Sequence, residues 1–341
     1  MWRARSSVAW MERVDFGWQR RAIVRASGRW AAAAAAGMLA ACASVQPAPR
    51  VISFGDSLSD LGTYGARTEG RTAGRFTTNP GPIWVEIVAT EMGGSVSGYR
   101  QAGWGRGEHV LGGLAYGEGG SRITEQPGSN NTDATAGAGS GQTTMPVREQ
   151  ISIHLQRDEF RAQDVVLVWA GANDIFRHAL FAPAPTAEAG EASIREAARS
   201  LAAEVRRIVA AGQPRVVVLT IDDYGETPSA RNGPNREKLS RWSNAFNADL
   251  IAGLQGAPVR LVDANRLLRE IRDEPVRFNL QQGLAPACAL GTLPQRSVAF
   301  CSLETLVAPD AHLTHLYADG VHLTTAGHRL VAQEALRAIR H

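Results

Sequence analysis

Four short apolar runs, alternating with segments of helical pattern, constrain the fold of this chain more than any other feature. The runs are rich in Val, Ile and Leu, as strands covered on both faces tend to be. They read RVISFG (50–55), DVVLVWAG (164–171), RVVVLTI (215–221) and VRLVDA (259–264). Apolar residues at helical spacing lie between and after them, in 82–93, 191–212, 235–256 and 324–340. This alternation predicts a three-layer α/β/α sandwich around a mostly parallel sheet.

One segment departs from this alternation. Residues 125–144 read EQPGSNNTDATAGAGSGQTT and contain almost no apolar side chain. A segment of this composition cannot contribute to a core, so we expect a flexible surface loop within a single domain spanning 50–341.

The N-terminal residues have the pattern of an export signal. Arginines precede the apolar stretch WAAAAAAGMLAAC, which ends at Cys42 and is shorter than the roughly 20 apolar residues of a membrane span. The small residues before Cys42 resemble the bacterial lipobox, in which the cysteine carries lipid and becomes the mature N-terminus. We therefore predict a signal peptide over 1–41 and a lipidated linker over 42–49. A plain signal-peptidase site with an incidental Cys42 is the alternative.

These segments predict where the protein works. Export with lipidation indicates the periplasm or the outer membrane, where the lipid anchor would attach the protein to a membrane. Secretion is the alternative. The formal charge of +3 does not indicate a nucleic-acid partner. Seven arginines against two acidic residues give the leader a charge of +5, which leaves −2 for the rest of the chain.

Two further cysteines fit an oxidising compartment. Cys288 and Cys301 lie 13 positions apart in a segment rich in Gly, Pro and Ala. A disulfide between them would stabilise the fold by about 3 kcal/mol, because it lowers the conformational entropy of the unfolded chain. Two free buried thiols are the alternative. The cysteine spacing offers no metal-binding cluster.

Polar residues follow the first two predicted strands. Ser57 comes directly after the first strand and Asn173 after the second. Ligands of open α/β sheets bind at the carboxyl ends of the strands, so both side chains should face one crevice. A serine nucleophile at this position is one interpretation, and an ordinary helix cap is the other.

A serine nucleophile needs a base that a third group orients. His322 follows Asp319 by three residues, just ahead of the last predicted helix, so one short loop supplies both groups. His312 and His315 form an H-x-x-H that would suit a metal-dependent hydrolase, although no further ligands are evident.

Four blocks along the chain together resemble one known family. They are FGDSLSD (54–60), YGEGGSR (116–122), GAND (171–174) and DGVHLTTAGH (319–328). Their order is similar to that in GDSL esterases and lipases, also called SGNH hydrolases, from about residue 50 to 335. The pattern looks closest to the passenger domains of bacterial GDSL autotransporter esterases. Those proteins carry a C-terminal barrel, whereas this chain ends at His341, and a lipid anchor would replace the barrel.

The resemblance implies a flavodoxin-like sheet and a role for each motif. Ser57 would be the nucleophile, His322 the general base and acid, and Asp319 the group that orients the imidazole. The oxyanion hole would comprise the backbone N–H groups of Ser57 and Gly119 and the side-chain amide of Asn173. The substrate would be an ester or a lipid, without metal or cofactor, and the protein would be a monomer.

The sequence leaves the finer roles of several residues and the substrate open. A tight turn is the alternative interpretation of Gly119 and Gly120, while Asp56 and Asp60 are expected to brace the serine loop. Lipase, lysophospholipase, arylesterase and sugar deacetylase activities all fit the motifs. The competing class is a non-catalytic envelope lipoprotein that uses the same fold as a binding module.

Overall fold

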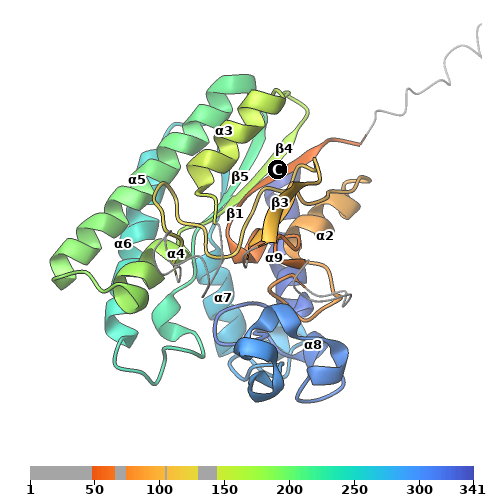
Figure 1. Ribbon diagram of the computed structural model, residues 1–341, viewed down its shortest axis with the longest axis vertical. Coiled ribbons are helices and arrows are strands. Elements are labelled where there is room, and N and C mark those ends of the chain that lie inside the picture. Colours follow the sequence, from red (N-terminus) through yellow and green to blue (C-terminus); the bar gives the residue numbers. More distant parts are fainter. Residues whose placement is uncertain (1–47, 66–73, 104–105, 130–143) are drawn as a thin grey trace, which may run out of the picture. The chain divides into compact units, whose positions relative to one another are not determined.

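The computed structural model describes residues 48–65, 74–103, 106–129 and 144–341, and Ala48–His341 form one unit (Figure 1). The predicted signal peptide (1–41), Cys42 and most of the 42–49 linker lie outside the described residues. So do residues 130–143 of the predicted loop. None of the helices in the described part of the chain combines the length and the apolar composition that a membrane span requires.

A parallel sheet forms the middle layer. Its four strands are adjacent in the order β1 (Val51–Gly55), β4 (Val165–Trp169), β5 (Arg215–Leu219) and β6 (Val259–Val262). Beyond β1, residues 114–116 pair with the sheet edge, since the Ser53 N–H donates to the Leu114 carbonyl at 3.0 Å and the Tyr116 N–H donates to the Ser53 carbonyl at 2.8 Å. With this segment included, the order is that of flavodoxin-like sheets, and the predicted fold class is confirmed.

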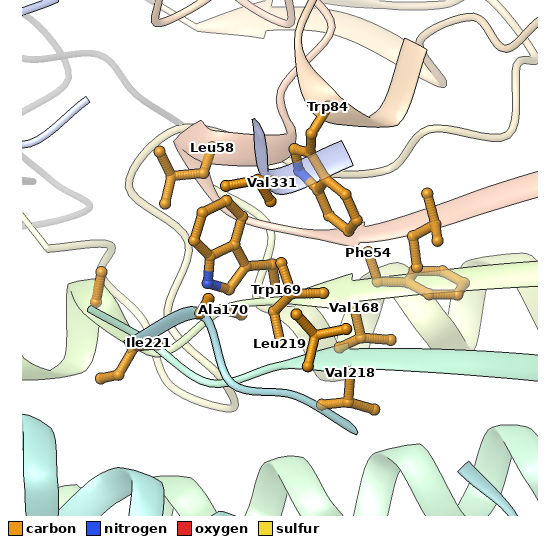
Figure 2. Packing of buried hydrophobic residues seen from close by; sticks show 14 of the residues in the cluster. Phe54, Leu58, Trp84, Val168, Trp169, Ala170, Val218, Leu219, Ile221 and Val331 are labelled. Carbon is orange, nitrogen blue, oxygen red and sulfur yellow. The ribbon is translucent and has the colours of Figure 1, made fainter. Parts of the chain in front are cut away.

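Helices cover both faces of the sheet (Figure 1). On one face α2 (Trp84–Glu91) packs against α9 (Thr325–Arg340). On the other lie α3 (Val147–Arg157), α5 (Ala187–Gly212) and α6 (Arg236–Leu254), with α5 against α6. The layers join through fully buried side chains such as Trp84 and Trp169, whose rings meet edge to face at 5.7 Å (Figure 2).

Local sequence explains most element boundaries. Helix α5 begins four residues before its predicted start, because Thr186 Oγ1 accepts a hydrogen bond from the Ala189 N–H at 3.1 Å and caps the helix. The last predicted strand is shorter than expected for the same reason. Asp263 accepts from the Arg266 N–H and starts the unpredicted helix α7 (Ala264–Asp273). Helix α3 and the antiparallel pair β2 (Arg100–Gly103) and β3 (Arg106–Val110) were also not predicted.

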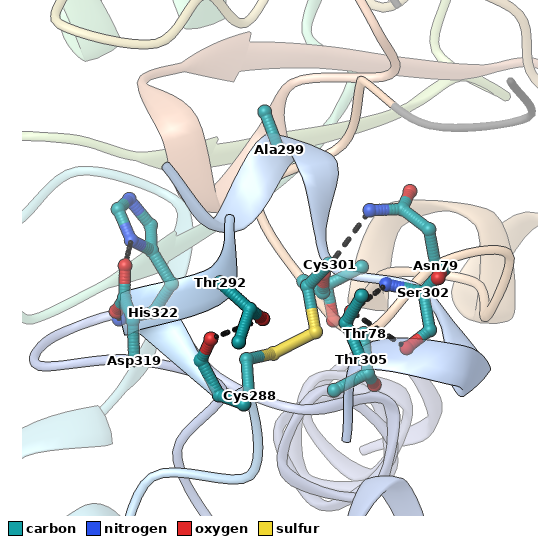
Figure 3. The surroundings of a disulfide bond; sticks show 12 residues. Thr78, Asn79, Cys288, Thr292, Ala299, Cys301, Ser302, Thr305, Asp319 and His322 are labelled. Carbon is teal, nitrogen blue, oxygen red and sulfur yellow. Dashed lines mark hydrogen bonds and ion pairs between the residues drawn. A yellow bond between two sulfur atoms is a disulfide. The ribbon is translucent and has the colours of Figure 1, made fainter. Parts of the chain in front are cut away.

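A disulfide organises the segment between α7 and the last loop, which consists largely of short 3₁₀ turns. Cys288 and Cys301 are joined, with their Cα atoms 6.0 Å apart, and both are buried (Figure 3). A second apolar cluster surrounds the bond and includes Tyr64, Phe76 and Val298. Through Phe76 this cluster reaches the carboxyl edge of the sheet.

Candidate active site

Ser57 lies at the first turn beyond strand β1. The alternative that it caps this turn is wrong, because the Asp56 carboxylate takes that role and accepts a hydrogen bond from the Leu58 N–H at 3.1 Å. Asp56 and Asp60 brace the loop as expected, since Asp60 Oδ1 accepts from the Thr63 N–H at 2.7 Å. The hydroxyl of Ser57 is thereby left to face the pocket.

A hydrogen-bonded chain connects Ser57 with the last loop. The Ser57 Oγ lies 2.9 Å from His322 Nε2. His322 Nδ1 in turn lies 2.8 Å from Asp319 Oδ2 (Figure 3). Asp319 Oδ1 also accepts from the backbone N–H groups of Val321 at 2.8 Å and His322 at 2.7 Å. One carboxylate therefore holds both the backbone and the ring of His322, which fixes the imidazole relative to Ser57.

The electrostatics of the loop favour a charged imidazole. Burial lowers the pKa of His322, but the charge and hydrogen bond of Asp319, with the charge of Asp56, outweigh burial and raise this pKa above its usual value. Burial raises the pKa of Asp319, but its contacts with His322 outweigh that effect and lower it below the usual range. An imidazolium formed by proton transfer from Ser57 would be stabilised here.

Asn173 supplies a hydrogen-bond donor to the same pocket. It lies in the short helix α4 (Ala172–Phe176) beyond strand β4, and its side chain is almost fully buried. Its Nδ2 is buried and has no hydrogen-bond partner within the described ranges. Buried amides are nearly always paired, so an unpaired N–H beside Ser57 points to a partner that arrives with the substrate.

Gly119 differs from its predicted role. Its N–H already donates to Asp60 Oδ2 at 2.8 Å, and its carbonyl accepts from the Tyr64 hydroxyl at 2.8 Å. A Cβ at Gly119 would lie 2.4 Å from Phe76, so close packing explains this glycine. The N–H of Gly119 is therefore not available to an oxyanion. Gly120, which has a φ of +89° and also lines the pocket, is the neighbouring candidate.

Phe76 is a pocket residue that sequence reasoning missed. Its ring stacks on the imidazole of His322, with centroids 5.2 Å apart and an interplanar angle of 26°. It also meets Tyr64 edge to face. Nothing in its sequence neighbourhood signals this position, because the contact joins residues 246 positions apart.

A buried network of charged and polar side chains anchors the loop that carries His322. Arg272 Nη1 donates to both carboxylate oxygens of Asp222 and to the Tyr317 hydroxyl, each at 2.7 Å. The Tyr317 hydroxyl donates to Asp222 at 2.8 Å. Tyr317 lies two residues before Asp319, and Asp222 follows strand β5. The network thus ties the loop to the sheet, and its members are too far apart in sequence to be recognised as one group.

The histidine pair considered for a metal lies elsewhere. His312 is on helix α8 (Ala311–Thr314) and His315 follows it, and neither lines the pocket. His315 Nδ1 is 3.1 Å from the Thr314 hydroxyl. Within the ranges that the structure describes, no group of three or more His, Cys, Asp or Glu is arranged to hold a metal ion.

Comparisons with known proteins identify the family of the chain. A family model described as GDSL-like lipase/acylhydrolase matches residues 51–335. A phosphatidylcholine-sterol acyltransferase of Aeromonas hydrophila is 25% identical over 307 residues, which cover 83% of this chain and 77% of that protein. An esterase of Pseudomonas aeruginosa is 31% identical over 121 residues, 34% of this chain and 18% of the esterase.

Solved structures include an acetylxylan esterase mutant from Geobacillus stearothermophilus. It is 15% identical, with a TM-score of 0.44, and the match covers 86% of this chain and 94% of that one.

Proposed function

The chain belongs to the family of GDSL-like lipases and acylhydrolases and is a carboxylic ester hydrolase, and we propose that it works through an acyl-enzyme formed on Ser57. One observation carries the proposal: the continuous hydrogen-bonded chain from Asp319 through His322 to Ser57, next to the Asn173 amide, whose Nδ2 has no partner among the residues that the structure describes. A nucleophile, a base, a group that orients the base and an anion-binding donor are thereby brought together.

In the first half-reaction, His322 Nε2 takes the hydroxyl proton of Ser57 while Oγ forms a bond to the ester carbonyl carbon. The carbonyl electron pair moves to oxygen, and the Asn173 amide and the N–H groups of Ser57 and Gly120 stabilise that charge. The bond to the alcohol oxygen then breaks, and the alcohol leaves with the proton from His322. Asp319 stays ionised throughout and keeps the imidazole oriented.

In the second half-reaction, water replaces the alcohol. His322 takes a proton from the water molecule, whose oxygen forms a bond to the acyl carbon. The tetrahedral intermediate collapses as the bond to Ser57 Oγ breaks and His322 returns the proton to the serine. The products are a carboxylic acid and the free enzyme, so no cofactor is required.

The pocket composition supports acyl esters as substrates. The pocket has a volume of about 230 Å³, and apart from the reacting groups its wall is largely apolar. Its apolar and aromatic members are Leu58, Phe76, Ala172, Phe176, Leu180, Phe181, Tyr224 and Val321. Such a wall suits a hydrocarbon chain better than a sugar.

The proposal extends to the location of the enzyme. The leader pattern supports export and lipid attachment at Cys42, which would hold a monomeric enzyme at the periplasmic or outer-membrane surface. Metabolic labelling with a palmitate analogue tests this, since the label should be lost in Cys42→Ser.

Labelling with a fluorophosphonate tests the serine mechanism. The full-length protein in detergent should be labelled and should hydrolyse p-nitrophenyl esters, and Ser57→Ala should abolish both. Ser229→Ala is the matched control, because Ser229 also lines the pocket and should not be needed. A folded wild type with neither label nor turnover would favour the binding-module alternative.

A further inference from the structure

A π turn follows directly on the helix that carries Asn173. Helix α4 continues without a break into the turn Arg177–Phe181. Single π turns are uncommon and are frequently found at functional sites. The turn is held in place, since Lys238 Nζ donates to the Ala179 carbonyl at 3.2 Å and the Ala182 N–H donates to the Arg177 carbonyl at 2.7 Å. The turn is therefore a fixed part of the pocket entrance.

The turn presents two large apolar side chains to solvent. Leu180 is 43% exposed and Phe181 is 53% exposed, and both line the pocket that contains Ser57. Single exposed apolar residues are common on protein surfaces. These two differ because they are adjacent and because they continue the apolar wall of a catalytic pocket to its rim.

The pocket-lining residues of α4 and the π turn lie at increasing distance from the reacting centre along the chain. Asn173, Phe176 and Leu180 follow one another along α4 and its π turn, and all three line the pocket, where they form one face. Seven residues would rise about 10 Å in an α-helix, and the wider π turn that contains Leu180 shortens this rise. The ring of Phe176 is held between the two ends by an edge-to-face contact with Tyr224, with centroids 4.8 Å apart. The face therefore runs from a polar end at Asn173 to an apolar end at Leu180.

We propose that Leu180 and Phe181 bind the distal part of the substrate's acyl chain and set the chain-length preference of the enzyme. An extended chain advances about 1.2 Å per covalent bond, so an acyl chain of about eight carbons spans the distance to Leu180. Shorter chains end beside Phe176 and leave the rim uncovered. This inference rests on the proposed ester hydrolysis and adds the class of acyl group, a medium or longer hydrocarbon chain.

The test compares chain-length profiles of the full-length protein and its variants. We expect kcat/KM of the wild type to rise from the butanoate to the octanoate p-nitrophenyl ester, by up to about fourfold for each methylene withdrawn from water. The double variant Leu180→Ser/Phe181→Ser should lose at least tenfold on octanoate and less than twofold on butanoate. Leu180→Met/Phe181→Leu should keep the wild-type profile, because the rim remains apolar.

Val276→Ser is the matched surface control, since Val276 is 78% exposed and lies outside the pocket. An unchanged octanoate-to-butanoate ratio in the serine double variant would overturn the inference. So would an equal loss on both esters. These outcomes are distinct from failure of the proposed function, in which no ester is hydrolysed or Ser57→Ala remains active.

Discussion

Removing the side-chain amide of Asn173 should lower the activity of this enzyme strongly while leaving its stability nearly unchanged. The Nδ2 of Asn173 is buried and no residue in the described part of the chain accepts a hydrogen bond from it, so Asn173→Ala removes no such bond among these residues. A buried unpaired donor costs about 1–3 kcal/mol, which offsets the packing lost with the side chain. The free energy of unfolding should therefore change by no more than about 1 kcal/mol.

The effect on catalysis should be much larger. If the amide binds the oxyanion, it acts chiefly when negative charge develops on the carbonyl oxygen, and its removal should lower kcat by about 10²–10³, or about 2.7–4 kcal/mol. KM should change little, because the neutral ester gains less from this donor. Asn173→Asp keeps the size of the side chain but replaces the donor with an acceptor, so it should be at least as inactive.

The two quantities are measured on the same preparations. Steady-state hydrolysis of p-nitrophenyl butanoate gives kcat and KM, and urea unfolding followed by tryptophan fluorescence gives the stability. A fall in kcat of less than tenfold would refute the assignment of Asn173 to the oxyanion. A loss of stability above about 3 kcal/mol would mean that the amide has a hydrogen-bond partner in the resting enzyme and would refute the reasoning.

Two further predictions concern the His322 loop and the disulfide. His322 must be neutral to accept a proton and its pKa lies above the usual value, so kcat/KM should be lost as the pH falls through that raised pKa. Asp319→Asn removes the largest influence that raises the pKa of His322. The acid limb of the kcat/KM profile should therefore move to lower pH while kcat falls by about 10⁴. An acid limb that stays at the same pH would contradict this. Replacing Cys288 and Cys301 together by alanine should lower the free energy of unfolding by about 3 kcal/mol, the entropy of a loop of this length. Urea midpoints measured beside Cys42→Ser, which keeps the disulfide, check this, and equal midpoints would contradict it.

Much of the fold was predictable because it depends on local patterns. A strand covered on both faces must be apolar along its whole length, so β1, β4 and β5 were evident as runs of Val, Ile and Leu. Helices such as α9 carry an apolar stripe and a threonine cap that can be read directly. Helix α7 is missed because its cap Asp263 and its first residue Ala264 fall within the predicted strand 259–264, whereas the strand ends at Val262.

The pairing of Asp319 with His322 was also within reach of the sequence, since three residues of one loop span the distance between them. Ser57 and Asn173 could be placed at one sheet edge because the carboxyl ends of parallel strands meet there.

The tertiary structure decided which backbone and side-chain groups remain free to act. The N–H of Gly119 donates to Asp60, which lies 59 residues away in sequence. The second backbone donor of the oxyanion hole is therefore expected at Gly120. Phe76 reaches His322 only through the packing of distant segments. Leu180 and Phe181 reach the pocket rim through the π turn that follows Asn173 along the chain. Sequence patterns specify which residues a strand or helix presents on each face. Contacts between loops depend instead on how those elements pack, because each loop side chain can meet many alternative neighbours until the layers are assembled.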